Sequence, residues 1–275
     1  MKFKILVIKV ITLSLNLYFI NLCILLQEKA FALSGIEIME KVNARDEGNR
    51  SIYDMEMVLL DKKGKKRVRK IKSFGLEKLG ESKSLMFFIA PSDVRNTGFL
   101  TFDYKESGKE DDQWMYLPAL KKTKRIASGD KSGSFMGSDL NYSDMTSPDL
   151  EKYDYTLMKE VEVKGNKVWQ IKAVPKTRDE AKKSGYSKSV IFIRQDNYVM
   201  IRAVRWLYKK KRYKYLDIKK LEKIEGIWVS SEMHITTKFG KKTIHKTILK
   251  RKNSRFNQED VTERIFSIRN LEKGF

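Results

Sequence analysis

The feature that most restricts the fold is a series of short segments in which apolar and polar residues alternate. In residues 227–235, Ile227 and Ile235 fall on one face of an extended chain, whereas Glu232 and His234 fall on the other. A period of two residues is typical of a β-strand with one buried face. The segment therefore predicts a half-buried strand.

Similar segments recur along the chain and are separated by turns rich in Gly, Asn, Asp or Pro. The expected strands are residues 53–59, 65–74, 83–90, 98–104, 112–117, 122–127, 155–163, 167–175, 190–194, 198–208, 213–221, 227–235 and 243–250. A short helical turn at 257–260 and a last extended piece at 265–270 are also expected. Because strands and helices do not alternate, a parallel α/β fold is excluded. The pattern predicts a mainly β protein built on one strongly curved antiparallel sheet.

One clear helix precedes the strands, with Ile36, Met39 and Val42 at helical spacing after Ser34. It is too small to cover the apolar face of so large a sheet. The uncovered face predicts either a cavity or groove, or a second layer of sheet. Residues 128–148 form the longest irregular stretch. Irregular stretches of this length are usually functional or disordered, so the apolar residues within this one need an explanation.

The N-terminus predicts export. Lys2 and Lys4 precede an apolar run over residues 5–26, and Ala30-Phe31-Ala32 resembles a cleavage site. We expect residues 1–32 to be a cleaved signal peptide and residues 33–275 to be a single periplasmic domain. An uncleaved membrane anchor is the alternative. Cleavage would remove Cys23, which is the single cysteine of the chain, and would leave no disulfide or thiol site.

The chain is strongly basic, with a net charge of +22. Residues 1–32 hold four lysines and one glutamate, so their removal leaves +19. In the cell envelope the available polyanions are phospholipid headgroups, glycolipids and acidic proteins, and export argues against nucleic acid as a partner. A functional basic surface and simple solubilising charge both remain open. Candidate headgroup or membrane contacts are Lys121, Lys122, Lys124 and Arg125.

No pattern of catalytic residues is recognisable in the sequence. The two histidines, His234 and His245, lie in expected strands without a nucleophile motif, and we expect both to face solvent. Metal-ligand spacings and a glycine-rich phosphate loop are also missing from the sequence. We therefore predict a protein that is not an enzyme and that uses neither a metal nor a cofactor.

Two central segments, residues 111–126 and 133–145, resemble the outer-membrane lipoprotein-sorting family of the LolA-like superfamily. Residues 42–46 and the strand around Met55 and Met57 are similar to the start of that family's domain. The resemblance implies an incomplete, strongly bent antiparallel β-barrel, with short helices covering its concave side and an apolar cleft for acyl chains. It also implies partnership with an inner-membrane transporter of the RND/MMPL type.

The resulting hypothesis is a periplasmic carrier or chaperone for a lipid or the acyl chains of a lipoprotein. Phe135 and Met136 are expected either to form a lid or to plug the core of the domain. An adaptor or sensor that binds the transporter without cargo is the alternative, and an enzyme acting on envelope glycolipid is a third hypothesis. The candidate lipid-binding residues are Met55, Met57, Trp114, Tyr116, Leu117, Phe135, Met136 and Tyr142.

Overall fold

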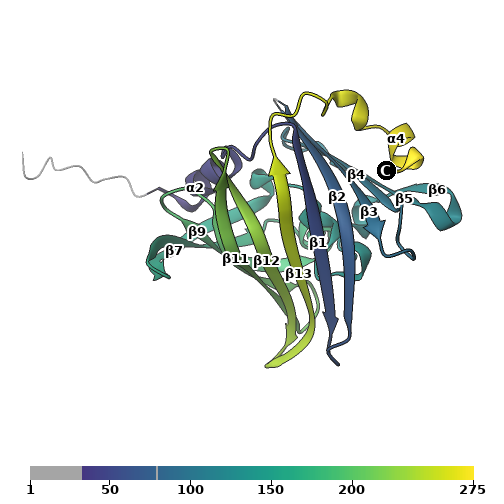
Figure 1. Cartoon of the computed structure of the whole chain (residues 1–275). Helices are drawn as coiled ribbons and strands as arrows, with labels where there is room; N and C mark the ends of the chain where they lie inside the picture. Colours follow the sequence, from purple (N-terminus) through teal and green to yellow (C-terminus); the bar gives the residue numbers. More distant parts are fainter. Residues whose placement is uncertain (1–32, 79) are drawn as a thin grey trace, which may run out of the picture. The chain divides into compact units, whose positions relative to one another are not determined.

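Thirteen strands pair into one antiparallel sheet in the computed structural model, which describes residues 33–78 and 80–275 (Figure 1). The expected signal peptide lies outside the described residues. The strands are β1 Ser51–Asp61, β2 Lys66–Lys78, β3 Glu81–Ala90, β4 Gly98–Tyr104, β5 Asp112–Leu117, β6 Lys122–Arg125, β7 Tyr153–Val163, β8 Asn166–Pro175, β9 Tyr186–Arg194, β10 Met200–Leu207, β11 Tyr213–Ile224, β12 Ile227–Phe239 and β13 Lys242–Arg255. Each expected strand is present.

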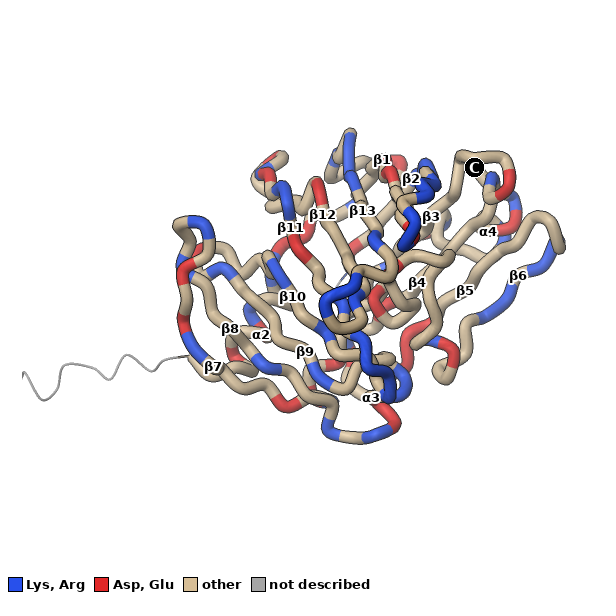
Figure 2. The backbone as a smooth tube through the Cα atoms, turned by 90° about the horizontal axis from the view of Figure 1, so that it is seen from below, with Lys and Arg blue, Asp and Glu red and all other residues tan. Residues whose placement is uncertain are grey.

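The sheet is open, because its order runs β6-β5-β4-β3-β2-β1-β13-β12-β11-β10-β9-β8-β7 and its two edge strands do not pair. The predicted mainly β fold, an incomplete and strongly curved antiparallel barrel with short helices, is confirmed. The strands follow an arc when the sheet is seen from one end (Figure 2).

Contacts of one loop show how strongly the sheet bends. Gln113 on β5 and Arg205 on β10 are eight strands apart in the sheet order, which corresponds to roughly 38 Å in a flat sheet. Nevertheless, the Gln113 side chain donates a hydrogen bond to the Tyr142 carbonyl at 2.9 Å, and Arg205 pairs with Asp144, only two residues further along. The face that carries this loop is therefore concave.

The three described helices are α2 (Gly35–Asn43), α3 (Arg178–Ser184) and α4 (Ile268–Lys273). With 9, 7 and 6 residues, each is too short to span a bilayer. The extended piece expected at 265–270 is wrong. The Ser267 side chain accepts a hydrogen bond from the Asn270 backbone N–H and caps α4, and Leu271 is fully buried. The helical turn expected at 257–260 is also wrong, since these residues form a non-helical turn.

Alternate residues of the strands enter two separate apolar clusters. On β3, Met86 and Phe88 enter the concave cluster, whereas Leu85 and Phe87 point to the convex face. The C-terminal segment covers the convex face of β1 to β5 through Val261, Phe266 and Leu271. The chain itself therefore buries that part of the convex face, whereas several apolar side chains of the concave face stay only half-buried.

Candidate functional site

The loop between β6 and β7, residues 126–152, lies on the concave face and is called the inner loop here. Its Phe135 side chain is 1% exposed. The Phe135 ring lies 5.0 Å from that of Phe99, 5.8 Å from that of Tyr142 and 6.2 Å from that of Phe88. Phe135 therefore packs in the core of the domain. Of the two roles expected for it, a lid or a plug of the core, this position corresponds to the plug.

Six of the eight candidate lipid-binding residues lie in or against the concave cluster, namely Met55, Met57, Leu117, Phe135, Met136 and Tyr142. The other two, Trp114 and Tyr116, pack in the convex cluster under the C-terminal segment. The reason is the alternation of side chains along β5, where Met115 and Leu117 take the concave side. A single apolar cavity cannot contain all eight residues.

A group of apolar side chains on the concave face remains only half-buried, and we call it the methionine patch. Its members are Met55, Met136, Met200, Ile218, Met233 and Leu249. The strand register places Met233 directly between Ile218 on β11 and Leu249 on β13. Methionine is flexible and polarizable, so a surface rich in it can adapt to apolar partners of irregular shape.

Beside the methionine patch, buried polar groups hold the inner loop against the sheet. The Asp139 carboxylate, 2% exposed, accepts hydrogen bonds from the hydroxyls of Thr237 and Thr247 and contacts His245 Nδ1 at 2.7 Å. The Asp139 backbone N–H also donates to the Thr247 hydroxyl at 2.9 Å. His245 is half-buried and bonded, so the expectation that it faces solvent is wrong. These contacts join the inner loop to β12 and β13.

Two further contacts continue this row along the loop. The Lys214 ammonium donates to Asn141 Oδ1 at 2.8 Å, and burial lowers the pKa of Lys214 to about 8. Arg205 forms an ion pair with Asp144, and the two side chains are 24% and 6% exposed. Although burial alone would lower it, the pKa of Arg205 is raised because the Asp144 carboxylate lies beside it. These contacts fasten the inner loop to the five adjacent strands β9 to β13, where the Tyr186 hydroxyl of β9 donates to Asp144. Arg69 of β2 and Gln113 of β5 add hydrogen bonds to the carbonyl groups of Met136 and Tyr142.

Sequence reasoning did not identify this polar row, although a signal was present. In the strand pattern, Lys214 shares a face with the apolar Leu216, and Thr237 shares a face with Ile235. A charged or polar residue on the apolar face of a strand must find a buried partner. The partners lie in the irregular loop, whose path cannot be deduced from period-two alternation.

The four basic candidates lie at the edge of the sheet, in the β5–β6 turn and on β6. Lys121, Lys122 and Lys124 are exposed, and Lys124 lies 3.6 Å from Asp130. Arg125 is held by Asp112, whose carboxylate accepts its hydrogen bonds and raises its pKa. Basic side chains on an edge strand also discourage pairing with another sheet, so their presence alone does not define a site.

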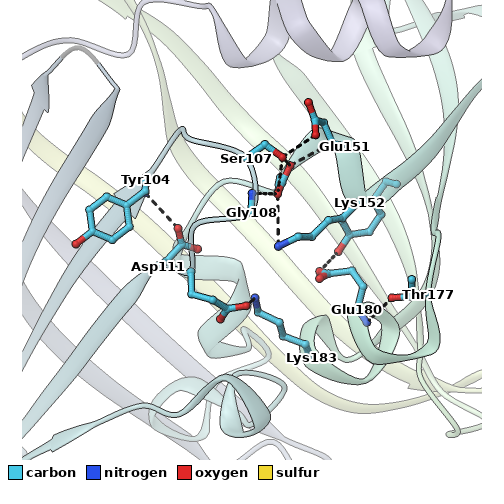
Figure 3. Close-up of polar contacts among 12 residues, drawn as sticks. Tyr104, Ser107, Gly108, Asp111, Glu151, Lys152, Thr177, Glu180 and Lys183 are labelled. Carbon is cyan, nitrogen blue, oxygen red and sulfur yellow. Dashed lines mark hydrogen bonds and ion pairs between the residues drawn. The ribbon is translucent and has the colours of Figure 1, made fainter.

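A polar cavity of about 580 Å³ opens between α2, the 103–111 turn, the inner loop and strands β7 to β9. Figure 3 shows polar contacts around it, among them that of the Ser107 hydroxyl, which donates to Glu151 at 2.8 Å. Glu180 accepts a hydrogen bond from the Tyr153 hydroxyl at 2.9 Å. Lys183 pairs with Glu110, and the hydrogen bonds from Lys183 and Ser128 outweigh the effect of burial and lower the pKa of Glu110 to about 2.

One carboxyl group of this cavity has an unusual environment. Burial raises the pKa of Asp103 to about 6, even though its carboxylate accepts a hydrogen bond from the Ser147 backbone N–H at 2.8 Å. Within the described part of the chain, no group of three or more His, Cys, Asp or Glu residues is arranged to hold a metal ion. The cavity is lined by many charged side chains, whereas the methionine patch is apolar, so the two sites favour different ligands.

Known proteins share this architecture. A family model described as "Uncharacterized protein" matches residues 80–273. A solved domain from Vibrio parahaemolyticus, described as outer membrane lipoprotein-sorting, is 32% identical with a TM-score of 0.77, covering 86% of this chain and 98% of that chain. A DUF1329 family protein from Desulfovibrio piger is 29% identical with a TM-score of 0.77, covering 86% and 97%.

A LolA superfamily protein from Nitrosomonas europaea shares the fold at 13% identity and a TM-score of 0.64, over 86% of this chain and 98% of that chain. No functionally curated protein matches the sequence. The match at 32% identity spans nearly the whole of its relative, and it agrees with the central segments that carry the resemblance in the sequence. The chain belongs to the LolA-like outer membrane lipoprotein-sorting family.

Proposed function

We propose that this protein is a non-catalytic periplasmic carrier or chaperone that binds a lipid, or the acyl chains of a lipoprotein, on its concave face. The observation that carries the proposal is the methionine patch, a half-buried apolar surface on the concave side of an open sheet. The relative from Vibrio parahaemolyticus, described as lipoprotein-sorting, supports the class of cargo.

The energetic basis is burial of the acyl chain. Each methylene group removed from water contributes about 0.8 kcal/mol, so about ten methylenes supply roughly 8 kcal/mol before the entropy cost of ordering the chain. Met136 belongs to the patch, and Phe135 precedes it in the inner loop. Displacement of this loop would extend the apolar surface, and in this proposal the loop acts as the lid.

The test uses two aspartate substitutions in the full chain with a fluorescent fatty acid as probe. Met233→Asp places a charge at the centre of the methionine patch, whereas Met158→Asp makes the same change at a methionine on β7 that is 50% exposed. We expect at least tenfold weaker probe binding for Met233→Asp and unchanged binding for Met158→Asp. Equal binding by both variants would contradict the proposal.

Native mass spectrometry of protein purified from envelope extracts identifies the cargo. We expect a co-purifying lipid or acylated peptide that is depleted in Met233→Asp. The alternative, an adaptor or sensor for an RND/MMPL-type transporter, predicts a cross-linked membrane protein and full function in Met233→Asp. Loss of function in that variant argues for the carrier.

A further inference from the structure

Three turns lie side by side at one end of the sheet, at the bottom in Figure 1. They join β1 to β2, β10 to β11 and β12 to β13. The register places them together, because Asp61 at the end of β1 pairs with His245 near the start of β13, and Tyr213 at the start of β11 pairs with Lys238 near the end of β12. Figure 2 looks at this end and shows Lys and Arg segments across it.

These turns carry twelve cations, which we call the basic rim: Lys62, Lys63, Lys65, Lys66, Arg67, Lys209, Lys210, Lys211, Arg212, Lys238, Lys241 and Lys242. All except the half-buried Lys238 are exposed. Asp61 is the one acidic residue in these turns, and its carboxylate accepts the backbone N–H groups of Lys63 and Lys65. None of the ion pairs among the described residues involves a member of the rim.

The opposite end of the sheet differs in charge. Its turns, at 78–81, 104–112, 163–166, 194–200 and 224–227, together hold seven acidic and five basic residues. Solubility depends on net charge and does not require the cations to lie together at one end of a fold. Repulsion among the rim cations disfavours this arrangement. The asymmetry indicates a surface that meets an anionic partner.

An apolar side chain projects from the same end. Phe239 lies in the β12–β13 turn, between Lys238 and Lys241, and is 50% exposed. An apolar side chain flanked by lysines is the arrangement by which peripheral proteins enter the headgroup region of a bilayer.

We propose that the basic rim docks onto an anionic lipid membrane, with Phe239 inserted among the headgroups. Ten of the twelve cations are lysines, and lysine acts as a compact point charge suited to diffuse attraction, whereas arginine is favoured where carboxylates or phosphates are gripped in a fixed geometry. An acidic protein face is therefore the less favoured partner. The inference goes beyond cargo binding, because it assigns a membrane-contacting surface that lies apart from the methionine patch.

Vesicle co-sedimentation tests the proposal with phosphatidylcholine vesicles that contain or lack phosphatidylglycerol. The rim variant carries Lys63→Gln, Lys210→Gln and Lys241→Gln, one change in each turn. The matched control carries Lys164→Gln, Lys167→Gln and Lys223→Gln, which remove three exposed cations from the opposite end. A basic residue near an anionic surface contributes about fivefold in binding, so the rim variant should lose roughly a hundredfold.

We expect wild type and control to bind only the anionic vesicles, with binding that weakens as salt is added, and Phe239→Ser to bind less well than wild type. Equal loss in the rim variant and the control, or no binding of wild type to anionic vesicles, would overturn the proposal. Binding of the fluorescent fatty acid in the absence of vesicles should be unchanged in the rim variant, so failure of membrane docking is distinguishable from failure of cargo binding.

Discussion

Asp139 on the inner loop and His245 on β13 are joined through the carboxylate and Nδ1 at 2.7 Å. The Asp139 side chain is 2% exposed and that of His245 is 20% exposed. With the hydroxyls of Thr237 and Thr247 as further donors, this carboxylate has three side-chain partners on the sheet. Because a buried carboxylate depends on such donors, Asp139 is one of the points at which the inner loop is fastened to the concave face.

Asp139→Ala should therefore loosen the inner loop and destabilise the domain. The three donors lose their acceptor in a buried site, which should cost about 2–4 kcal/mol in the free energy of unfolding. Urea denaturation followed by circular dichroism measures this change. Asp154→Ala, on the exposed surface of β7, is the control and should change stability by less than about 0.5 kcal/mol. Equal free energies of unfolding for the two variants would show that Asp139 does not fasten the inner loop.

The ion pair between Arg205 and Asp144 should show strong coupling. Asp144→Ala leaves the guanidinium partly buried without its carboxylate, and Arg205→Met leaves the carboxylate beside Tyr186 without its cation. Each single change should cost about 3–5 kcal/mol, and the double variant should cost much less than the sum. A double-mutant cycle in urea measures the coupling. Simple additivity of the two effects would show that the pair does not hold the loop.

Phe135→Ala should destabilise the domain and open apolar space beneath the inner loop. Loss of a fully buried phenylalanine costs about 3–5 kcal/mol, whereas Phe239→Ala, at a side chain that is 50% exposed, should cost less than about 0.5 kcal/mol. A cavity lined by apolar side chains stays dry and accepts apolar ligands. Thermal unfolding with and without a fatty acid should show a larger ligand-induced increase in Tm for Phe135→Ala than for wild type.

The elevated pKa of Asp103 predicts a pH dependence of stability. Its ordinary value is 3.8 and its value in the fold is about 6, so the native state holds this proton more tightly than the unfolded state. Stability contributed by this group is therefore present at low pH and lost as the pH rises from about 4 to 6. Asp103→Asn should remove this dependence and stabilise the protein at pH 7 by up to about 2 kcal/mol. A variant with the wild-type pH profile would contradict this assignment.

The strands were predictable from sequence because their signal is local. Side-chain alternation is a property of each segment, and it placed β4 and β5 at their observed bounds, Gly98–Tyr104 and Asp112–Leu117. The same alternation puts Trp114 and Tyr116 on one face of β5 and Met115 and Leu117 on the other. The prediction that Trp114, Tyr116 and Leu117 all line one cleft conflicts with this alternation, whereas the identity of the convex face depends on the tertiary structure.

The helix α4 and the side-chain partners of the inner loop depend on tertiary contacts, so side-chain alternation could not predict them. The segment after Ile265 has apolar residues that fit either a strand or a helix, and only the Ser267 cap and the burial of Leu271 decide for α4. The partners of Lys214 and His245 lie more than 70 residues away in the chain, in an irregular loop. Such pairings are set by the curvature of the sheet, which sequence patterns do not specify.

Acyl-chain binding at the methionine patch can be located by photocross-linking of the full chain with a fatty acid that carries a diazirine on its chain, followed by mapping of the modified residues. We predict adducts on the peptides that contain Met55, Met136, Met200, Ile218, Met233 and Leu249, and competition by unlabelled lipid. Adducts that map to the side chains of Trp114 and Tyr116 on the convex face, or adducts that lipid does not displace, would contradict binding at the patch.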